Sequence, residues 1–210
     1  MTDFGGPAIQ DLAWSPDSGK LLTSVLRQGQ FDLIEVDVAN GKSRPITRTA
    51  LDERHGAYFG PAFIDFVRRA GTVYALRRLD RRTGIEAQLT TSVMRLVAAT
   101  PSDHLVFTRP FQAGVWIAGK DGRDPRRLTD FPDVTRMRDI TVSRDRIYAV
   151  KVESGLGYLV EIDPESGAHR TIRELPAITR PSGIAIAGDS VIYARVLRLD
   201  ADLYRLRLSG

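Results

Sequence analysis

The sequence contains no cysteine, which excludes disulfide bonds, zinc–thiolate sites and thiol nucleophiles together. No apolar run approaches the length of about 18 residues that a membrane-spanning helix requires. The first ten residues have neither the basic region nor the apolar region of a signal peptide. From these absences we expect a soluble, cytoplasmic protein with no membrane contact.

Histidine is also scarce. The three histidines, His55, His104 and His169, are far apart in the sequence, and none belongs to the close pairs that are typical of metal sites. We expect His55 to lie in a polar linker and the other two to lie in or beside turns. The sequence therefore predicts neither a metal site nor a cofactor.

Arginine dominates the charge of the chain. Of the 30 basic residues only four are lysine, and the formal net charge is +4. The densest basic run, residues 68–82, includes an expected strand, on which successive side chains point to opposite faces. Without a coherent patch or interleaved aromatic residues, we expect these arginines to form a solvated outer rim, with no direct nucleic-acid contact.

A turn pattern recurs along the chain, in which an aspartate stands four residues before a glycine. Aspartate can accept hydrogen bonds from the turn backbone, and glycine can adopt the positive φ that closes the turn. A short alternating strand precedes each of these turns. The turns are Asp37–Gly41, Asp80–Gly84 and Asp163–Gly167, with the variant Gly119–Gly122.

A second pattern opens each unit: a strand of small or apolar residues, a polar turn, and a second strand rich in β-branched or aromatic residues. This pattern predicts a hairpin. Ala13–Asp17 provides the clearest turn, and we expect Trp14, and later Trp116, to lie in the core. In the second unit we assign the opening strand to residues 61–66.

Each unit therefore reads as four antiparallel strands with a period of about 40–45 residues, which is the blade of a β-propeller. We expect an all-β fold and a single domain over residues 1–210. A parallel α/β fold would need amphipathic helices, which are absent, and a β-sandwich would not repeat one turn at a fixed period. The five expected blade units are residues 8–47, 48–90, 91–129, 130–172 and 173–210.

These units resemble the Ser-Pro-Asp-Gly-type repeats of TolB-type propellers, and they are similar to the propellers of prolyl-oligopeptidase-type enzymes. Residues 114–129, 145–148, 183–195 and 202–204 also resemble the C-terminal propeller of bacterial winged-helix transcriptional regulators. The resemblance implies a sensory or interaction propeller. DNA binding and peptidase activity do not carry over, because the sequence has neither a winged helix nor a Gly-x-Ser-x-Gly motif.

Alignment of the expected innermost strands brings charged residues of different blades to neighbouring levels of the central channel. Asp11 and Asp139 share one level, Arg95 and Arg138 share the next, and Arg180 lies slightly further out. The arginines could hold an anion or an acidic peptide, because a guanidinium group forms paired hydrogen bonds with a carboxylate. Alternatively, they could pair with the two aspartates across blades.

We expect a non-catalytic propeller that binds a protein or a small anionic ligand through these five residues. Two alternatives stay open: a glycosidase-like hydrolase that uses the channel carboxylates, and an accessory propeller of a prolyl-oligopeptidase-type enzyme. The only expected partner for the last strand, residues 202–208, is the glycine- and proline-containing segment 2–7. We therefore expect either a larger parent propeller or pairing of this edge with another chain.

Overall fold

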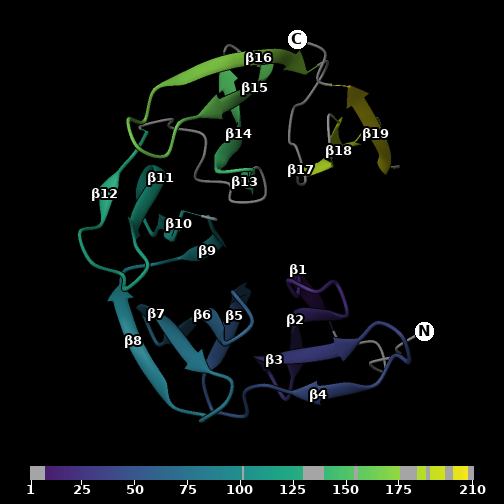
Figure 1. Cartoon of the computed structure of the whole chain (residues 1–210), viewed down its shortest axis with the longest axis vertical. Helices are drawn as coiled ribbons and strands as arrows, with labels where there is room; N and C mark the ends of the chain where they lie inside the picture. Colours follow the sequence, from purple (N-terminus) through teal and green to yellow (C-terminus); the bar gives the residue numbers. More distant parts are fainter. Residues whose placement is uncertain are drawn as a thin grey trace.

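The computed structural model describes residues 8–100, 102–129, 140–153, 156–175, 184–187, 190–196 and 201–207. Every regular element in these residues is a β-strand, and none of them forms a helix that could span a membrane. The strands form five antiparallel sheets arranged around a common centre (Figure 1). This arrangement confirms the all-β propeller predicted from the sequence.

Each sheet follows the order of its strands in the chain, so that neighbours in the sequence are also neighbours in space. The first sheet contains β1 (Ile9–Trp14), β2 (Lys20–Arg27), β3 (Gln30–Asp37) and β4 (Ser43–Pro45). The second contains β5 (Asp52–Phe59), β6 (Phe63–Ala70), β7 (Val73–Asp80) and β8 (Glu86–Thr91). The third contains β9 (Arg95–Ala99), β10 (His104–Arg109), β11 (Gln112–Gly119) and β12 (Arg126–Arg127).

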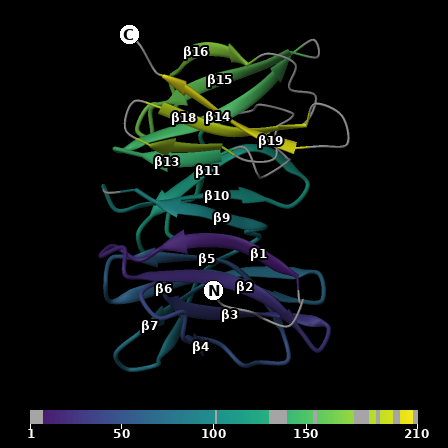
Figure 2. The same cartoon turned by 90° about the vertical axis from the view of Figure 1, so that its right-hand side faces the viewer.

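The last two sheets repeat the pattern. The fourth contains β13 (Ile140–Ser143), β14 (Arg146–Glu153), β15 (Leu156–Ile162) and β16 (His169–Leu175). The fifth contains β17 (Ile184–Ala187), β18 (Ser190–Val196) and β19 (Ala201–Arg207). The first strand of each sheet faces the centre, and β4, β8, β12 and β16 lie at the periphery (Figure 1). Figure 2 shows the first and last sheets on the near side, with β9 and β10 visible behind them across the centre.

The hydrophobic core is divided into clusters that lie between successive sheets. Leu22 and Leu33 of the first sheet pack with Ile64 and Phe66 of the second. The clusters between the later sheets centre on Phe107, on Ile147 and Val160, and on Leu159 and Val191. Such packing buries both faces of an inner sheet, so each blade depends on its neighbours for its core.

One face of the propeller positions the candidate site. Because the strands are antiparallel, the hairpins that join the second strand of each sheet to the third lie at the same end as the start of the first strand. We call this end the hairpin face. It carries the tips of the β2–β3, β6–β7 and β10–β11 hairpins together with the first residues of β1, β5 and β9.

The second blade differs from the sequence-based expectation. Its innermost strand is β5, residues 52–59, and the segment at 61–66 instead contains a turn and the start of β6. Gly60-Pro61 therefore takes the place that Ser15-Pro16 has in the first blade. The difference arises because the sequence of β5 is rich in polar residues, which are typical of a linker. His55, which we expected in a linker, is part of an innermost strand.

Two further expectations about side-chain burial hold only in part. Trp14 is 58% exposed, because it ends β1 on the side that faces away from the cluster shared with the second sheet. Trp116 is partly buried against the cluster around Phe107. The basic run is a solvated rim only at its exposed members, Arg69 and Arg82. Arg68 and Arg78 are each only 14% exposed and form ion pairs with Glu53 and Asp65, respectively.

The expected strand donor, residues 2–7, lies outside the described residues, as does Leu208. Within the described part, β19 pairs with β18.

Candidate functional site

Two residues near the centre of the molecule adopt a positive φ, which is uncommon for residues other than glycine. Asp11 of β1 has a φ of 59° and His55 of β5 has a φ of 56°. Both sit where the strand register shifts against the next strand, which is the geometry of a β-bulge. Bulges re-aim side chains, and residues held in this left-handed region often belong to functional sites.

The bulges bring Asp11 and His55 together from two different blades. Nδ1 of His55 lies 2.8 Å from Oδ2 of Asp11, and a guanidinium nitrogen of Arg95, at the start of β9, lies 3.7 Å from Oδ1. Each of these side chains is about one-fifth exposed. Three successive innermost strands therefore contribute one charged or ionisable group each.

The electrostatics keep Asp11 ionised. Burial raises the pKa of its carboxyl group, but the contact with His55 and the nearby charge of Arg95 outweigh burial, and the pKa is lowered from its ordinary value. Asp11 is therefore a carboxylate at neutral pH. This contact of Arg95 with Asp11 corresponds to one of the two alternatives that the sequence leaves open.

Three of the five predicted site residues, Arg138, Asp139 and Arg180, lie outside the described residues. Of the five, the structure describes Asp11 and Arg95 and brings them together.

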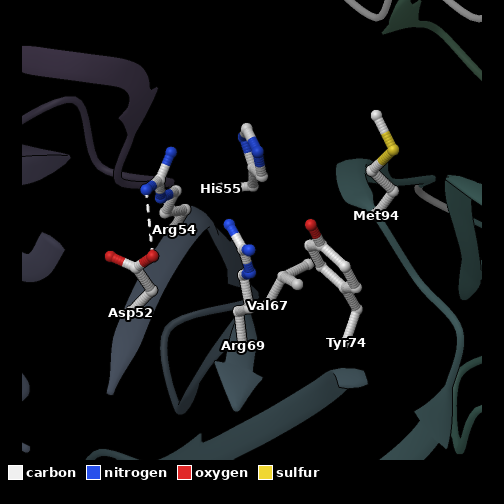
Figure 3. Close-up of a pocket in the computed structure, with 7 residues that line it drawn as sticks. All are labelled: Asp52, Arg54, His55, Val67, Arg69, Tyr74 and Met94. Carbon is white, nitrogen blue, oxygen red and sulfur yellow. Dashed lines mark hydrogen bonds and ion pairs between the residues drawn. The ribbon is translucent and has the colours of Figure 1, made fainter. Parts of the chain in front are cut away.

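A pocket of about 160 Å³ adjoins this cluster on the hairpin face. In Figure 3, Arg54 turns aside to Asp52, whereas His55, Arg69 and the hydroxyl group of Tyr74 point toward the same space. Its lining residues are Asp52, Arg54, His55, Val67, Arg69, Tyr74 and Met94.

The two arginines of the pocket differ in whether a carboxylate pairs with their charge. Arg54 forms an ion pair with Asp52 at 3.0 Å and stacks over Phe31, with its Cζ 4.1 Å from the ring centroid. Arg69 lies over Tyr74 at 5.4 Å and donates from Nε to the carbonyl oxygen of Gly71 at 2.8 Å. No described carboxylate forms an ion pair with Arg69, so its charge is available to a ligand.

The described residues contain no group of three or more histidine, cysteine, aspartate or glutamate side chains arranged to hold a metal ion. The pocket instead combines cationic and hydroxyl groups with the apolar surfaces of Val67, Met94 and the Tyr74 ring. This combination suits an organic anion with a short apolar part.

Sequence reasoning missed His55, Arg69, Tyr74 and Met94 as site residues. The missed signal is the Gly60-Pro61 pair: aligned with Ser15-Pro16 and Thr100-Pro101, it makes residues 52–59 an innermost strand. The contribution of Met94, which lies just before β9, had no such signal.

No protein-family model matches the chain, and no curated protein matches it. Solved structures do match. TolB from Acinetobacter baumannii has a TM-score of 0.68 and 17% identity, with 90% of this chain and 51% of that chain covered. This chain therefore spans about half the length of that protein. The nidogen/laminin complex gives a TM-score of 0.74 at 12% identity, with 96% of this chain and 76% of that chain covered.

Enzymes occur among the structural neighbours as well. An oligogalacturonate lyase in complex with manganese has a TM-score of 0.65 and 15% identity, with 99% of this chain and 64% of that chain covered. At these identities the likeness concerns the fold alone. The comparisons and the strand arrangement together establish that this chain has the fold of a TolB-type β-propeller.

Proposed function

We propose that this propeller is a non-catalytic binding module whose pocket on the hairpin face takes a ligand with a carboxylate group. The observation that carries the proposal is Arg69, which lines the pocket and forms no ion pair with a described carboxylate. Arg54, by contrast, is neutralised by Asp52. A guanidinium group in a partly enclosed site binds a carboxylate through charge-assisted hydrogen bonds.

The size and lining of the pocket narrow the ligand class. Its volume corresponds to about five water molecules at about 30 Å³ each, which suits a short organic acid or the end of a peptide. The Tyr74 hydroxyl group can donate to the same carboxylate, and Val67 and Met94 offer an apolar surface to the rest of the ligand. This role agrees with the sensory or interaction module implied by the resemblance to TolB-type and regulator-type propellers.

A glycosidase-like hydrolase would need a general acid other than Asp11, and the second predicted carboxyl group, Asp139, lies outside the described residues. Such an enzyme needs a protonated carboxyl group as its general acid, and that group normally has a raised pKa. The pKa of Asp11 is instead lowered by His55 and Arg95, despite the opposing effect of burial. A carboxylate that stays ionised is better suited to positioning His55 and Arg95 than to donating a proton.

Isothermal titration calorimetry with N-acetyl-leucine and the matched N-acetyl-leucinamide tests the proposal. The two compounds differ in the carboxylate, so we expect the acid to bind and the amide to bind at least tenfold more weakly. Arg69→Gln should weaken binding of the acid by about tenfold or more, because charged hydrogen bonds contribute about 1.5–3 kcal/mol. Arg82→Gln, in an exposed turn, is the control. Equal binding of acid and amide would contradict the proposal.

A further inference from the structure

The tip of the β10–β11 hairpin presents an aromatic side chain to solvent. Arg109 pairs with Gln112, so Pro110 and Phe111 form the turn. Phe111 is 104% exposed, the highest exposure among the large hydrophobic residues described. Full exposure means that the side chain packs against nothing in its own chain.

The backbone conformation at Phe111 also gives the folded state no reason to favour a phenylalanine at this position. Its φ is 59°, a conformation that costs a bulky residue strain and that glycine adopts freely. In the first blade, Arg27 pairs with Gln30, and the same turn position is occupied by Gly29 with a φ of 87°. Glycine therefore occupies this turn position in one blade, whereas a strained, exposed phenylalanine occupies it in another.

Other hairpin tips on the same face also expose apolar side chains. Val73, which begins β7, is 56% exposed, and Leu156, which begins β15, is 40% exposed. With Phe111 they follow the hairpins of three successive blades. Isolated exposed apolar residues are ordinary, but Val73, Phe111 and Leu156 recur in or directly after the turns of three successive hairpins. We call these three residues the apolar rim of the hairpin face.

Cationic groups accompany this rim. Arg109, next to the turn, stacks on Trp116 with its Cζ 4.1 Å from the ring centroid, and no described carboxylate forms an ion pair with it. In the neighbouring blade, Arg69 lies one residue before the end of β6. Stacking holds a guanidinium plane in one orientation, which favours directional hydrogen bonds to a carboxylate.

From these contacts we infer that the apolar rim, centred on Phe111 and Arg109, docks a partner polypeptide in which acidic residues flank an exposed aromatic or apolar residue. The partner's ring or aliphatic side chain would cover Phe111, and its carboxylate would accept hydrogen bonds from Arg109. Aromatic and arginine side chains are the residues that most often anchor protein interfaces.

Two other occupants fit the charges less well. A second copy of this chain carries the same net charge of +4 and the same arginines, so like charges would meet. An anionic membrane would meet Glu153, which is 60% exposed, pairs with Leu156 across the β14–β15 hairpin and forms an ion pair with Lys151 at 2.9 Å, so this ion pair offers the membrane no net positive charge. An acidic peptide, which is small, can contact Arg109 without approaching Glu153.

Fluorescence anisotropy with three labelled peptides tests this inference: Gly-Asp-Glu-Trp-Glu-Asp-Gly, the same peptide with serine in place of tryptophan, and the same peptide with asparagine and glutamine in place of the acids. We expect only the first to bind appreciably. Phe111→Gly should weaken its binding at least fivefold while raising Tm by about 2–4 °C, because glycine relieves the strained turn. A purely structural role for Phe111 would lower Tm instead.

Arg109→Gln should also weaken peptide binding at least fivefold, and Val38→Ser, an exposed apolar residue beyond the other end of the sheets, should leave binding unchanged. Phe111→Gly should not change the binding of N-acetyl-leucine, so a failure of the proposed peptide docking can be distinguished from a failure of the proposed ligand pocket. Unchanged peptide binding in Phe111→Gly would overturn the inference. So would binding to phosphatidylserine vesicles in place of the peptide, or self-association by sedimentation velocity that Phe111→Gly abolishes.

Discussion

Asp11 and His55 show how single backbone conformations assemble the centre of this molecule. Each has a positive φ at a bulge, and each comes from a different innermost strand. The resulting contact of 2.8 Å links the first two blades near the pocket. We therefore expect substitutions at these residues to affect both folding stability and ligand binding.

Asp11→Asn should lower the free energy of unfolding by about 1–2 kcal/mol at pH 7, because it removes the charge that His55 and Arg95 face. The folded-state pKa of Asp11 is lowered, so its stabilisation is full above the ordinary value of 3.8 and is lost as pH falls through the lower folded value. Urea unfolding at pH 7 and at pH 3 measures both effects. Asp121→Asn, in an exposed turn, is the control; an equal loss in both variants would contradict the expectation.

At the scale of the element, the Asp-x-x-x-Gly turns do what the sequence pattern predicts. In each of the three turns, the aspartate side chain accepts hydrogen bonds from the turn backbone, and the backbone N–H group of the glycine donates to the aspartate carbonyl oxygen. Gly41, Gly84 and Gly167 have φ values of 69°, 74° and 74°. The repeated sequence pattern therefore encodes one turn structure, which joins the third strand of a blade to the fourth.

The hydrogen bonds of the turn at Asp163 should be detectable as a lowered pKa of the Asp163 carboxyl group. Backbone N–H donation from Ser166, the Ser166 hydroxyl group and Arg146 lower the pKa of Asp163 from 3.8 to about 2. The turn should therefore stabilise the fold fully above about pH 4 and lose that contribution as pH falls toward 2. An NMR titration of the Asp163 carboxyl carbon measures the pKa. Ser166→Ala should move it upward, and a wild-type midpoint near 3.8 would count against this account.

Gly114 in β11 tests a different constraint, the close approach of two backbone segments. A Cβ atom there would lie 1.8 Å from the carbonyl oxygen of Thr129, and the φ of Gly114 is 102°. Gly114→Ala should destabilise the chain by at least about 3 kcal/mol. The matched control is Gly71→Ala, which also has a positive φ but no atom within 4 Å of the added Cβ, so that a loss of about 1 kcal/mol is expected. Similar losses in thermal unfolding would refute the steric explanation.

At the scale of the whole molecule, charged networks join the blades alongside the apolar clusters. Glu35, 2% exposed, accepts hydrogen bonds from Lys20 and Arg44 of the first blade at 3.2 and 2.8 Å. It also accepts them from Tyr58 and Arg81 of the second blade at 2.9 and 2.7 Å. Burial raises the pKa of Glu35, but these donors outweigh it and lower the pKa overall. One carboxylate thus connects two sheets.

Glu35→Gln should therefore lower the free energy of unfolding by about 3 kcal/mol, because it leaves three cations around an uncharged group. A double-mutant cycle with Arg81→Gln should give a coupling free energy above about 1 kcal/mol, since the two residues belong to different blades and touch. Asp103→Asn, whose ion pair with Lys120 is exposed, should cost less than about 0.5 kcal/mol. Additive effects of Glu35→Gln and Arg81→Gln would rule out this link between the blades.

The sequence by itself determined the local architecture of this protein. Turn chemistry at Asp37–Gly41 and its two counterparts, and the hairpins that open the units, depend on residues close together in the chain, so their pattern predicts the blades directly. Of the candidate site, the sequence placed Asp11 and Arg95 on innermost strands. The placement of these two residues follows from the order of the strands in the sequence.

Tertiary structure alone decided which groups meet. A bulge at His55 changes the register of β5 by an amount that no local pattern specifies, and it turns a residue expected in a linker toward Asp11. The contact of Glu35 with Arg81 of the neighbouring blade, and the exposure of Trp14, likewise depend on how the sheets pack against one another. Contacts between blades join residues far apart in the chain, and their geometry exists only once the sheets have packed.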